Sequence, residues 1–356
     1  MNVVIRADAS LKIGTGHVMR CLTLASELKK KGARVEFICR AHDGNLIEYI
    51  QQAGYVVHSL AIDPRFQPAP SSLFHADWLG ATQNEDAELS KDIVERLHAD
   101  WVIVDHYSID FNWEKEIRKS EKRIMVIDDL ADRKHDCDLL LDQNLGRALT
   151  DYSGLVPEDC SVFSGPSNAL LREEFWKLRY KKKNSNKSNL NILIFFGGMD
   201  LDDYTGRTVR LLHSIGLVNV EVVIGRNNIN QKTIKSVCND FNYNCHVETN
   251  KMEKIMHKSD MYIGAGGCTI LERIIMRLPS VTIALAENQV EPLKYLAQTG
   301  ACIYLGDRKM LSDKKLKQAI LKALNEINTL TTNCEALCEE YFSERPQWLQ
   351  KLFIKQ

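Results

Sequence analysis

Short apolar runs alternate with amphipathic segments along most of the chain. Residues 3–5 form an apolar run that enters a polar bend with Gly14 and Gly16, and apolar residues recur at helical spacing from His17 onward. Further apolar runs of strand length lie at 34–39, 56–60, 101–105, 124–128, 190–196, 220–224, 261–263 and 281–285. Between them lie helical patterns at 45–53, 85–97 and 270–277, and a proline-containing loop at 62–82. Apolar strands separated by helices predict parallel, doubly wound sheets.

A polar, basic stretch at 179–189 separates two such regions. At 356 residues the chain exceeds the size at which a single core usually stops growing, about 250–300 residues. We therefore expect a Rossmann-like domain at 1–180 and a second one, with C-terminal helices, at 189–356. Two such α/β domains facing each other across a cleft are the plan of the GT-B glycosyltransferases. Near the C-terminus, four residues form an apolar face that could pack equally well on the first or the second domain: Trp348, Leu349, Leu352 and Phe353.

The composition excludes several classes of partner. A net charge of −1 gives no general attraction to nucleic acid or anionic lipid, and 44% hydrophobic with 26% charged residues is typical of a soluble globular protein. Ten scattered cysteines without a Cys-x-x-Cys pair favour reduced thiols over disulfides or zinc. No signal-peptide pattern and no apolar stretch of ~18 residues is present in the sequence. We expect a cytoplasmic monomer that needs no cofactor or metal and binds neither nucleic acid nor membrane.

The bend after the first strand is a candidate anion site. Gly14 and Gly16 allow positive φ or close approach of a ligand, and the following helix start offers unpaired N–H groups. The dinucleotide spacing is absent because Arg20 stands where a third glycine is expected. His17 lies at the lip of this loop, where an imidazole, which titrates near pH ~6.5, can serve as a general base or only cap the loop.

Further candidates follow later strands. Asp105, Tyr107 and Asp128 come at strand ends, where doubly wound sheets bind ligands, although aspartates also cap turns. Two glycine-rich turns of the second domain can hold a diphosphate through backbone N–H groups: Gly197-Gly198, and Gly266-Gly267-Cys268-Thr269. Glu272 shares a helix face with Thr269, so it either faces the ligand or only complements the helix dipole.

Six short motifs are spread over the chain: Arg6-x-Asp8, Gly14-Thr15-Gly16-His17-x-x-Arg20, Asp105-His106-Tyr107, Asp128-Asp129, Asp142-Gln143-Asn144 and Glu287-Asn288-Gln289. Together they resemble the UDP-sugar hydrolase family of pseudaminic acid biosynthesis. The resemblance covers nearly the whole chain.

This resemblance implies hydrolysis of a UDP-linked 2,4-diacetamido-2,4,6-trideoxyhexose, by type the β-L-altropyranose, to UDP and the free sugar with inversion. It implies that His17 accepts a proton from the attacking water, that Tyr107 lies near the reacting sugar, and that an acid at position 272 binds the ribose. The Asn288 amide offers a donor and an acceptor to a sugar hydroxyl, acetamido or phosphate group, and we expect His17, Tyr107 and Asn288 to be the catalytic residues. The other residues expected to bind substrate are Asp8, Gly14, Gly16, Arg20, Asn144, Gly197, Gly198, Gly266, Gly267, Thr269, Glu272 and Gln289.

Three other functions remain open from the sequence. A glycosyltransferase would share the anion loops but use an acceptor other than water. A hydrolysing UDP-sugar 2-epimerase would exchange the proton at carbon 2. A binding protein without activity would hold UDP and release no sugar.

Overall fold

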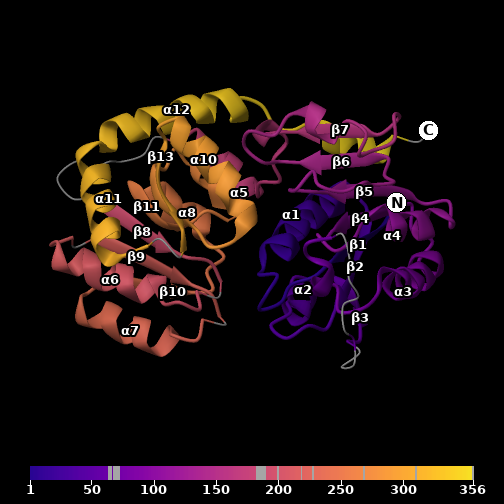
Figure 1. Cartoon of the computed structure of the whole chain (residues 1–356), viewed down its shortest axis with the longest axis horizontal. Helices are drawn as coiled ribbons and strands as arrows, with labels where there is room; N and C mark the ends of the chain where they lie inside the picture. Colours follow the sequence, from indigo (N-terminus) through magenta and orange to yellow (C-terminus); the bar gives the residue numbers. More distant parts are fainter. Residues whose placement is uncertain are drawn as a thin grey trace. The chain divides into compact units, whose positions relative to one another are not determined.

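The chain forms two compact units, shown in Figure 1. The computed structural model describes all residues except 63–65, 67–72, 182–189, 199, 218, 227, 268, 309–310 and 355–356. Unit 1 comprises Met1–Leu170 with Arg345–Gln356, and unit 2 comprises Leu171–Glu344. Most of the basic stretch expected to link the domains, together with Cys268 and part of the proline-containing loop, lies outside the described residues.

Unit 1 is built on a seven-stranded parallel sheet with the order β3-β2-β1-β4-β5-β6-β7. Its strands are β1 (Asn2–Ala7), β2 (Arg34–Arg40), β3 (Val56–Leu60), β4 (Trp101–Asp105), β5 (Arg123–Ile127), β6 (Leu139–Asp142) and β7 (Ser161–Ser164). Central strands are buried on both faces: Ile5 of β1 pairs in register with Phe37 and Ile103, and all three are 0% exposed. This burial explains the nearly continuous apolar sequence of these strands.

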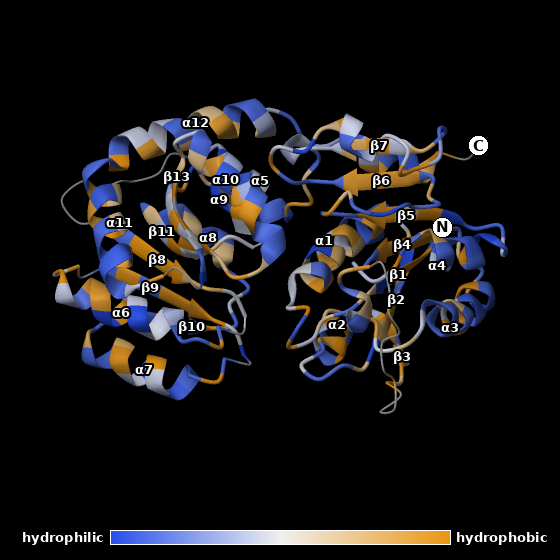
Figure 2. Ribbon diagram, in the orientation of Figure 1, coloured by the Kyte–Doolittle hydropathy of each residue, from blue (hydrophilic) through white to orange (hydrophobic). Residues whose placement is uncertain are grey.

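Helices cover both faces of this sheet. One apolar cluster joins the sheet to α1 (Gly16–Lys30) and α2 (Ile47–Gln52), and a second joins it to α3 (Gln83–Arg96) and α4 (Phe111–Arg118). In Figure 2 apolar strands lie between helices whose outer faces are hydrophilic. Helix α3 begins at a capping box, in which Thr82 and Glu85 satisfy each other's backbone N–H groups.

The C-terminal residues return to unit 1. Trp348 and Leu352, in the 3-10 segment η6 (Trp348–Phe353), are 3% and 1% exposed within the cluster that also holds α1. The indole N–H of Trp348 donates to the carbonyl of Asn168 at 2.9 Å, and that of Trp101 donates to the carbonyl of Leu352 at 3.0 Å. The apolar face that fitted either domain from sequence therefore packs on the first one.

Unit 2 repeats the same plan with six parallel strands in the order β10-β9-β8-β11-β12-β13. Its strands are β8 (Asn191–Phe195), β9 (Asn219–Ile224), β10 (Asn244–Val247), β11 (Met261–Ala265), β12 (Ser280–Ala284) and β13 (Cys302–Asp307). Its helices are α5 (Glu173–Arg179), α6 (Tyr204–Ser214), α7 (Gln231–Asp240), α8 (Met252–Lys258), α9 (Thr269–Ile275), α10 (Val290–Gln298), α11 (Asp313–Asn325) and α12 (Ile327–Phe342).

The boundaries of the two units differ from the predicted 1–180 and 189–356. Residues 171–180 belong to the second unit, because α5 packs against α8 and α9. Residues 345–356 belong to the first unit, because Trp348 and Leu352 pack in its core. The prediction of two Rossmann-like parallel-sheet domains is confirmed.

In both sheets the strand order reverses between two central strands, β1 and β4 in unit 1 and β8 and β11 in unit 2. Doubly wound sheets bind ligands beyond the carboxyl ends of the strands at this point. The loops that follow these four strands are the ones expected to carry the site. Among the described residues, no helix is long and apolar enough to span a bilayer.

Candidate functional site

The loop after β1 is held by its own backbone and by one serine. The Ser10 hydroxyl accepts the N–H groups of Lys12 and Ile13 at 3.1 and 2.9 Å, and Gly14, at φ +78°, donates its N–H to the Ser10 carbonyl. A Cβ added at Gly14 or Gly16 would have no atom within 4 Å. The N-cap of α1 makes no side-chain hydrogen bond, so this loop and helix start are open to a ligand.

His17 lies in the first turn of α1 and contacts a carboxylate at the end of β4. Its Nδ1 is 2.5 Å from Oδ1 of Asp105, which is fully buried. Arg20 donates from Nε and Nη2 to the two oxygens of Asp105, each at 2.6 Å. Burial alone would raise the pKa of Asp105, but the charge of Arg20 and the hydrogen bonds from Arg20 and His17 hold that pKa well below its usual value.

An ionised Asp105 fixes the tautomer of the imidazole. A carboxylate only accepts hydrogen bonds, so Nδ1 of His17 carries the proton and Nε2 of the neutral ring carries the lone pair. Within the described part of the chain, Nε2 of His17 has no hydrogen-bond partner. The arrangement is that of a histidine oriented for proton acceptance. The sequence analysis placed Asp105 at a strand end but did not identify it as the partner of His17.

Tyr107 lies beside His17 but does not present its hydroxyl to a ligand. Its ring meets the imidazole edge-on, with 4.5 Å between centroids, and is 3% exposed. Its hydroxyl donates to Asp129 at 2.6 Å, and Arg20 and the Asn144 amide also bind that carboxylate, at 2.8 and 3.0 Å. We expected Tyr107 to face the reacting sugar and Arg20 and Asn144 to bind substrate. In this structure all three hold the loops around His17 in place.

Asp8 is likewise buried and held by other residues of the chain, and its predicted substrate-binding role stays a prediction. It is 0% exposed and accepts hydrogen bonds from Nη1 of Arg6 at 2.6 Å and from the backbone N–H of Arg40 at 2.7 Å. Nε2 of His106 lies 3.2 Å from its other oxygen. Burial opposes ionisation, but the Arg6 charge and the histidines hold the pKa of Asp8 well below its usual value.

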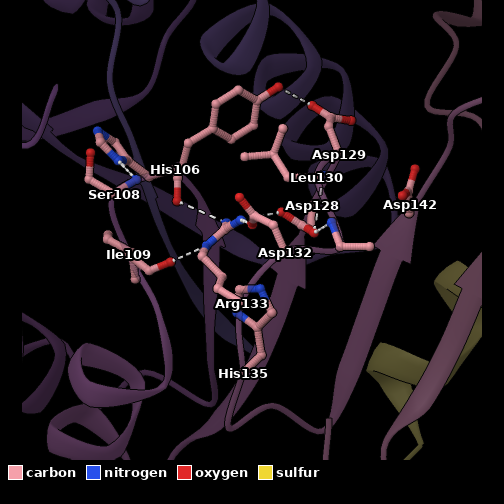
Figure 3. Close-up of polar contacts among 12 residues, drawn as sticks. His106, Ser108, Ile109, Asp128, Asp129, Leu130, Asp132, Arg133, His135 and Asp142 are labelled. Carbon is pink, nitrogen blue, oxygen red and sulfur yellow. Dashed lines mark hydrogen bonds and ion pairs between the residues drawn. The ribbon is translucent and has the colours of Figure 1, made fainter. Parts of the chain in front are cut away.

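Arg133 connects the loops that follow β4 and β5, as Figure 3 shows. It donates to the carbonyls of Ile109 and His106 at 2.8 and 3.4 Å and pairs with Asp128 at 2.9 Å. The loop that carries Tyr107 is thereby fixed to the loop that carries Asp129. Exact placement of these loops matters because a base must be within hydrogen-bond reach of its substrate.

The glycines of unit 2 serve close packing as well as ligand access. Gly197, at φ +91°, has open space where its Cβ would lie, whereas a Cβ on Gly266 would lie 2.4 Å from Leu293. Gly198 lies against Gly225, whose added Cβ would be 2.1 Å from the Gly198 carbonyl oxygen. Gly197 and Gly198 follow β8, and Gly266 follows β11, so both turns flank the reversal in strand order.

The helix after Gly197-Gly198 is already capped by carboxylates of the chain. Asp200 accepts the N–H groups of Tyr204 and Thr205 at 2.9 and 2.8 Å, and Asp203 accepts that of Gly206 at 3.1 Å. Neither aspartate was predicted as a cap, although Asp before a helix is a common capping signal. The start of α6 is therefore not free for a diphosphate.

The turn after β11 collects the other predicted residues of unit 2. A Cβ on Gly267 would lie 3.7 Å from Nε2 of Gln289, whose Oε1 accepts the N–H of Leu285 at 3.0 Å. Thr269 begins α9 and is 6% exposed. Asn288 is exposed on the 3-10 segment η4 (Glu287–Gln289). Its catalytic role stays a prediction.

Glu272 lies one turn into α9 and is partly buried. Burial raises the pKa of its carboxyl to about 7; Glu253 adds to this, and Arg172 opposes it. Arg172 is committed to another acid, since its Nη2 lies 3.3 Å from Oε2 of Glu253. In the part of the chain that is described, the Glu272 carboxyl makes no hydrogen bond or ion pair, so it is available to a ligand.

The described residues include no group of three or more His, Cys, Asp or Glu that could hold a metal ion. Nine of the cysteines are free thiols, most of them buried.

Comparison with known proteins adds sequence relatives and fold neighbours. Residues 183–344 match the glycosyltransferase family 28 C-terminal domain. The chain is 27% identical over 301 residues to UDP-2,4-diacetamido-2,4,6-trideoxy-beta-L-altropyranose hydrolase of Campylobacter jejuni, covering 84% of this chain and 97% of that protein. It is 23% identical over 330 residues to spore coat polysaccharide biosynthesis protein SpsG of Bacillus subtilis, covering 89% and 87%.

Solved structures share the fold along the whole chain. The spinosyn rhamnosyltransferase SpnG superposes with a TM-score of 0.70 at 15% identity, covering 99% of this chain and all (100%) of that one. MurG of Acinetobacter baumannii gives a TM-score of 0.63 at 15% identity, covering 99% and 97%. The chain thus has the paired Rossmann-like domains of the GT-B glycosyltransferases and is similar in sequence, over most of its length, to a UDP-sugar hydrolase.

Proposed function

We propose that this protein hydrolyses UDP-2,4-diacetamido-2,4,6-trideoxy-β-L-altropyranose to UDP and the free sugar, with inversion at the anomeric carbon. The observation that carries the proposal is the contact of His17 Nδ1 with the ionised Asp105 at 2.5 Å, which leaves Nε2 as a base. The sequence similarity to a hydrolase of this specificity supports the choice of substrate.

The reaction needs one proton acceptor and a stabilised leaving group. Nε2 of His17 takes a proton from water as the water oxygen bonds to the anomeric carbon, and the bond from that carbon to the diphosphate oxygen breaks with its electron pair on UDP. Backbone N–H groups of the turns at Gly197 and Gly267 stabilise the departing diphosphate, and Glu272 binds the ribose hydroxyls. UDP leaves as a stable anion, so a carboxylic acid that protonates the leaving oxygen is less necessary than in ordinary glycoside hydrolysis.

Hydrolysis in ¹⁸O-labelled water tests the proposal. Attack at carbon places the label in the sugar, whereas attack at phosphorus places it in UDP. His17→Asn should lower turnover by on the order of 10²–10⁴-fold. Its affinity for UDP should be nearly unchanged, because the proposed nucleotide contacts are in the other unit. Label in UDP, or near-native turnover of the variant, would contradict the assignment.

Two companion assays separate the alternatives. A glycosyltransferase would release UDP only when an acceptor sugar or lipid is added. A 2-epimerase would incorporate deuterium at carbon 2 in heavy water. The sequence similarity to a hydrolase favours water as the acceptor, so we expect UDP release in buffer alone and no deuterium at carbon 2.

A further inference from the structure

Aromatic rings form a continuous series in unit 1 that starts at the proposed base. The ring of His17 contacts Tyr107 at 4.5 Å, and Tyr107 stacks on Trp78 at 5.8 Å with 25° between their planes. His75 packs against both, 4.1 Å from Trp78 and 5.3 Å from Tyr107, and its other neighbour is Phe74 at 4.8 Å. These five residues are called the ring series below.

The ring series runs from the interior to the surface. His17 and Tyr107 are 7% and 3% exposed, Trp78 is partly buried, and Phe74 is 74% exposed. The indole N–H of Trp78 has no hydrogen-bond partner in the described chain. Trp78 therefore presents both part of an apolar ring face and a free donor close to Tyr107.

The chain holds this segment against the loops at the reversal in strand order. Trp78 ends the 3-10 segment η1 (Ala76–Trp78), and the hydroxyl of Ser108, next to Tyr107, donates to the carbonyl of His75. Asp77 pairs with Lys12 of the loop after β1 at 3.1 Å. Leu79, directly after η1, is 1% exposed in the core below. The position of Trp78 is thus set by contacts to both loops and to the core.

We propose that Trp78 is the specificity-determining residue for the sugar, selecting pyranoses that carry a deoxy carbon and acetamido groups. This inference rests on the proposed hydrolase function. A ring face binds C–H and methyl groups and gains nothing from hydroxyls, so a trideoxy sugar stacks on it better than a fully hydroxylated one. The free indole N–H donates to an acetamido carbonyl, which fixes the orientation of the sugar.

Steady-state kinetics of Trp78→Ala and Trp78→Phe test the role. For the UDP-diacetamido-trideoxy sugar, Trp78→Ala should lower kcat/KM by on the order of tenfold or more, mainly through KM, while inhibition by UDP stays the same. Trp78→Phe keeps a ring and loses the N–H, so its loss should be smaller. Phe111→Ala, an exposed aromatic on α4 outside the ring series, is the matched control and should match the native protein.

Tryptophan fluorescence gives a readout that needs no turnover. The other four tryptophans are 5% exposed or less: Trp101, Trp113, Trp176 and Trp348. The free sugar 2,4-diacetamido-2,4,6-trideoxy-L-altrose should therefore quench or shift the emission of Trp78, glucose should not, and Trp78→Phe should lose the response.

Each outcome decides one of the two proposals. An unchanged kcat/KM in Trp78→Ala, or emission that the diacetamido sugar leaves unaltered, overturns the role of Trp78. If Trp78→Ala does not fold, Trp78→Phe and the fluorescence titration still decide it. A native protein that binds the free sugar through Trp78 but releases none from the UDP-sugar would reject the hydrolase function and leave the sugar-binding role standing.

Discussion

Replacing Glu272 by Gln should stabilise the protein at alkaline pH and weaken its binding of UDP. A carboxyl whose pKa is raised from 4.5 to about 7 is destabilised in its charged form by on the order of 3 kcal/mol. The cause is burial, reinforced by Glu253 and only partly offset by Arg172. A glutamine side chain at this position has nearly the same shape and carries no charge.

The sign follows from proton binding. Between pH 4.5 and about 7 the folded protein holds this proton and the unfolded chain does not, so the stabilisation present below pH 4.5 is lost as the pH rises through the folded pKa. Near pH ~8.5, the free energy of unfolding of Glu272→Gln should exceed that of the native protein by on the order of 3 kcal/mol. Near pH ~5.5 the difference should be on the order of 1 kcal/mol.

Urea unfolding of both proteins at the two pH values measures this difference, with pulse proteolysis reporting the second unit. Glu291→Gln, at an acid of α10 whose side chain is 79% exposed, is the control and should change stability by less than ~0.5 kcal/mol. An equal effect of Glu272→Gln at both pH values would refute the raised pKa.

Ribose binding adds a second, independent consequence. Ribose hydroxyls donate best to an ionised carboxylate, so UDP must displace the proton of Glu272, and its affinity should rise with pH up to about pH 7 and then level off. Calorimetry in buffers of different ionisation enthalpy measures the released proton. A pH-independent affinity, or an unchanged one in Glu272→Gln, would show that Glu272 does not contact the ribose.

Other predictions follow from single contacts. Asp105→Asn removes the acceptor that orients His17, so kcat should fall by on the order of 10²-fold or more with UDP affinity unchanged; a native kcat would dismiss the orienting role. Activity should survive EDTA, because backbone amides can neutralise the diphosphate, and rescue by magnesium after a loss would contradict this. Trp348→Ala should lower the free energy of unfolding of unit 1 by about 3–5 kcal/mol in urea titrations, as a buried ring and its bond to Asn168 are lost; a smaller loss than ~1 kcal/mol would mean that η6 is not part of this core.

The sequence predicts most of the central strands of both sheets from their apolar runs, but it misses the short, fully buried strand β6. Residues 101–104 are apolar and residue 105 is an aspartate, and β4 spans the same five residues. The edge strand β7, with the polar ends Ser161 and Ser164, has no such pattern and was not predicted. Periodicity reports burial, so elements that are half exposed or short give little signal.

The fold of the C-terminal residues could not be decided from their own pattern. Trp348 and Leu352 form an apolar face that any core would accept, and only the positions of Asn168 and Trp101 determine which core takes it. Contacts between residues far apart in sequence carry no local signature. The same reason hid the neighbour relation of Trp78 and Tyr107.

Residue type alone does not distinguish a side chain that faces a ligand from one that supports the surrounding loops. Asp8 and Arg20 have the charges that a substrate-binding role needs, but both are buried in ion pairs. A motif shows that a residue is part of the site's architecture and does not separate contact from support. Burial decides between the two, and it depends on how the loops after β1, β4 and β5 pack together.

Two arginines pair with buried aspartates near His17, and one of these pairs keeps Asp105 ionised. Arg20 donates two bonds to Asp105, and Arg133 pairs with Asp128, so the pKa of each of these buried acids, which burial would raise, is held well below its usual value. Removing water from a carboxylate costs several kcal/mol unless a cation compensates. Asp105 therefore stays ionised throughout the neutral pH range and remains the acceptor for Nδ1 of His17.

Asp142, at the end of β6, pairs with Arg147, which is more exposed to water than Arg20 and Arg133. Burial and the nearby charge of Asp129 raise its pKa to about 7, and Arg147, whose side chain is 23% exposed, only partly offsets them. A carboxyl near the base thus titrates close to neutrality, and its charge acts on Asp129, which holds Tyr107 against the imidazole. We therefore expect Asp142 to produce a break near pH 7 in the rate profile. The rate profile of Asp142→Asn tests this: a break near pH 7 that disappears in the variant belongs to Asp142, and a break that persists shows that Asp142 is not its source.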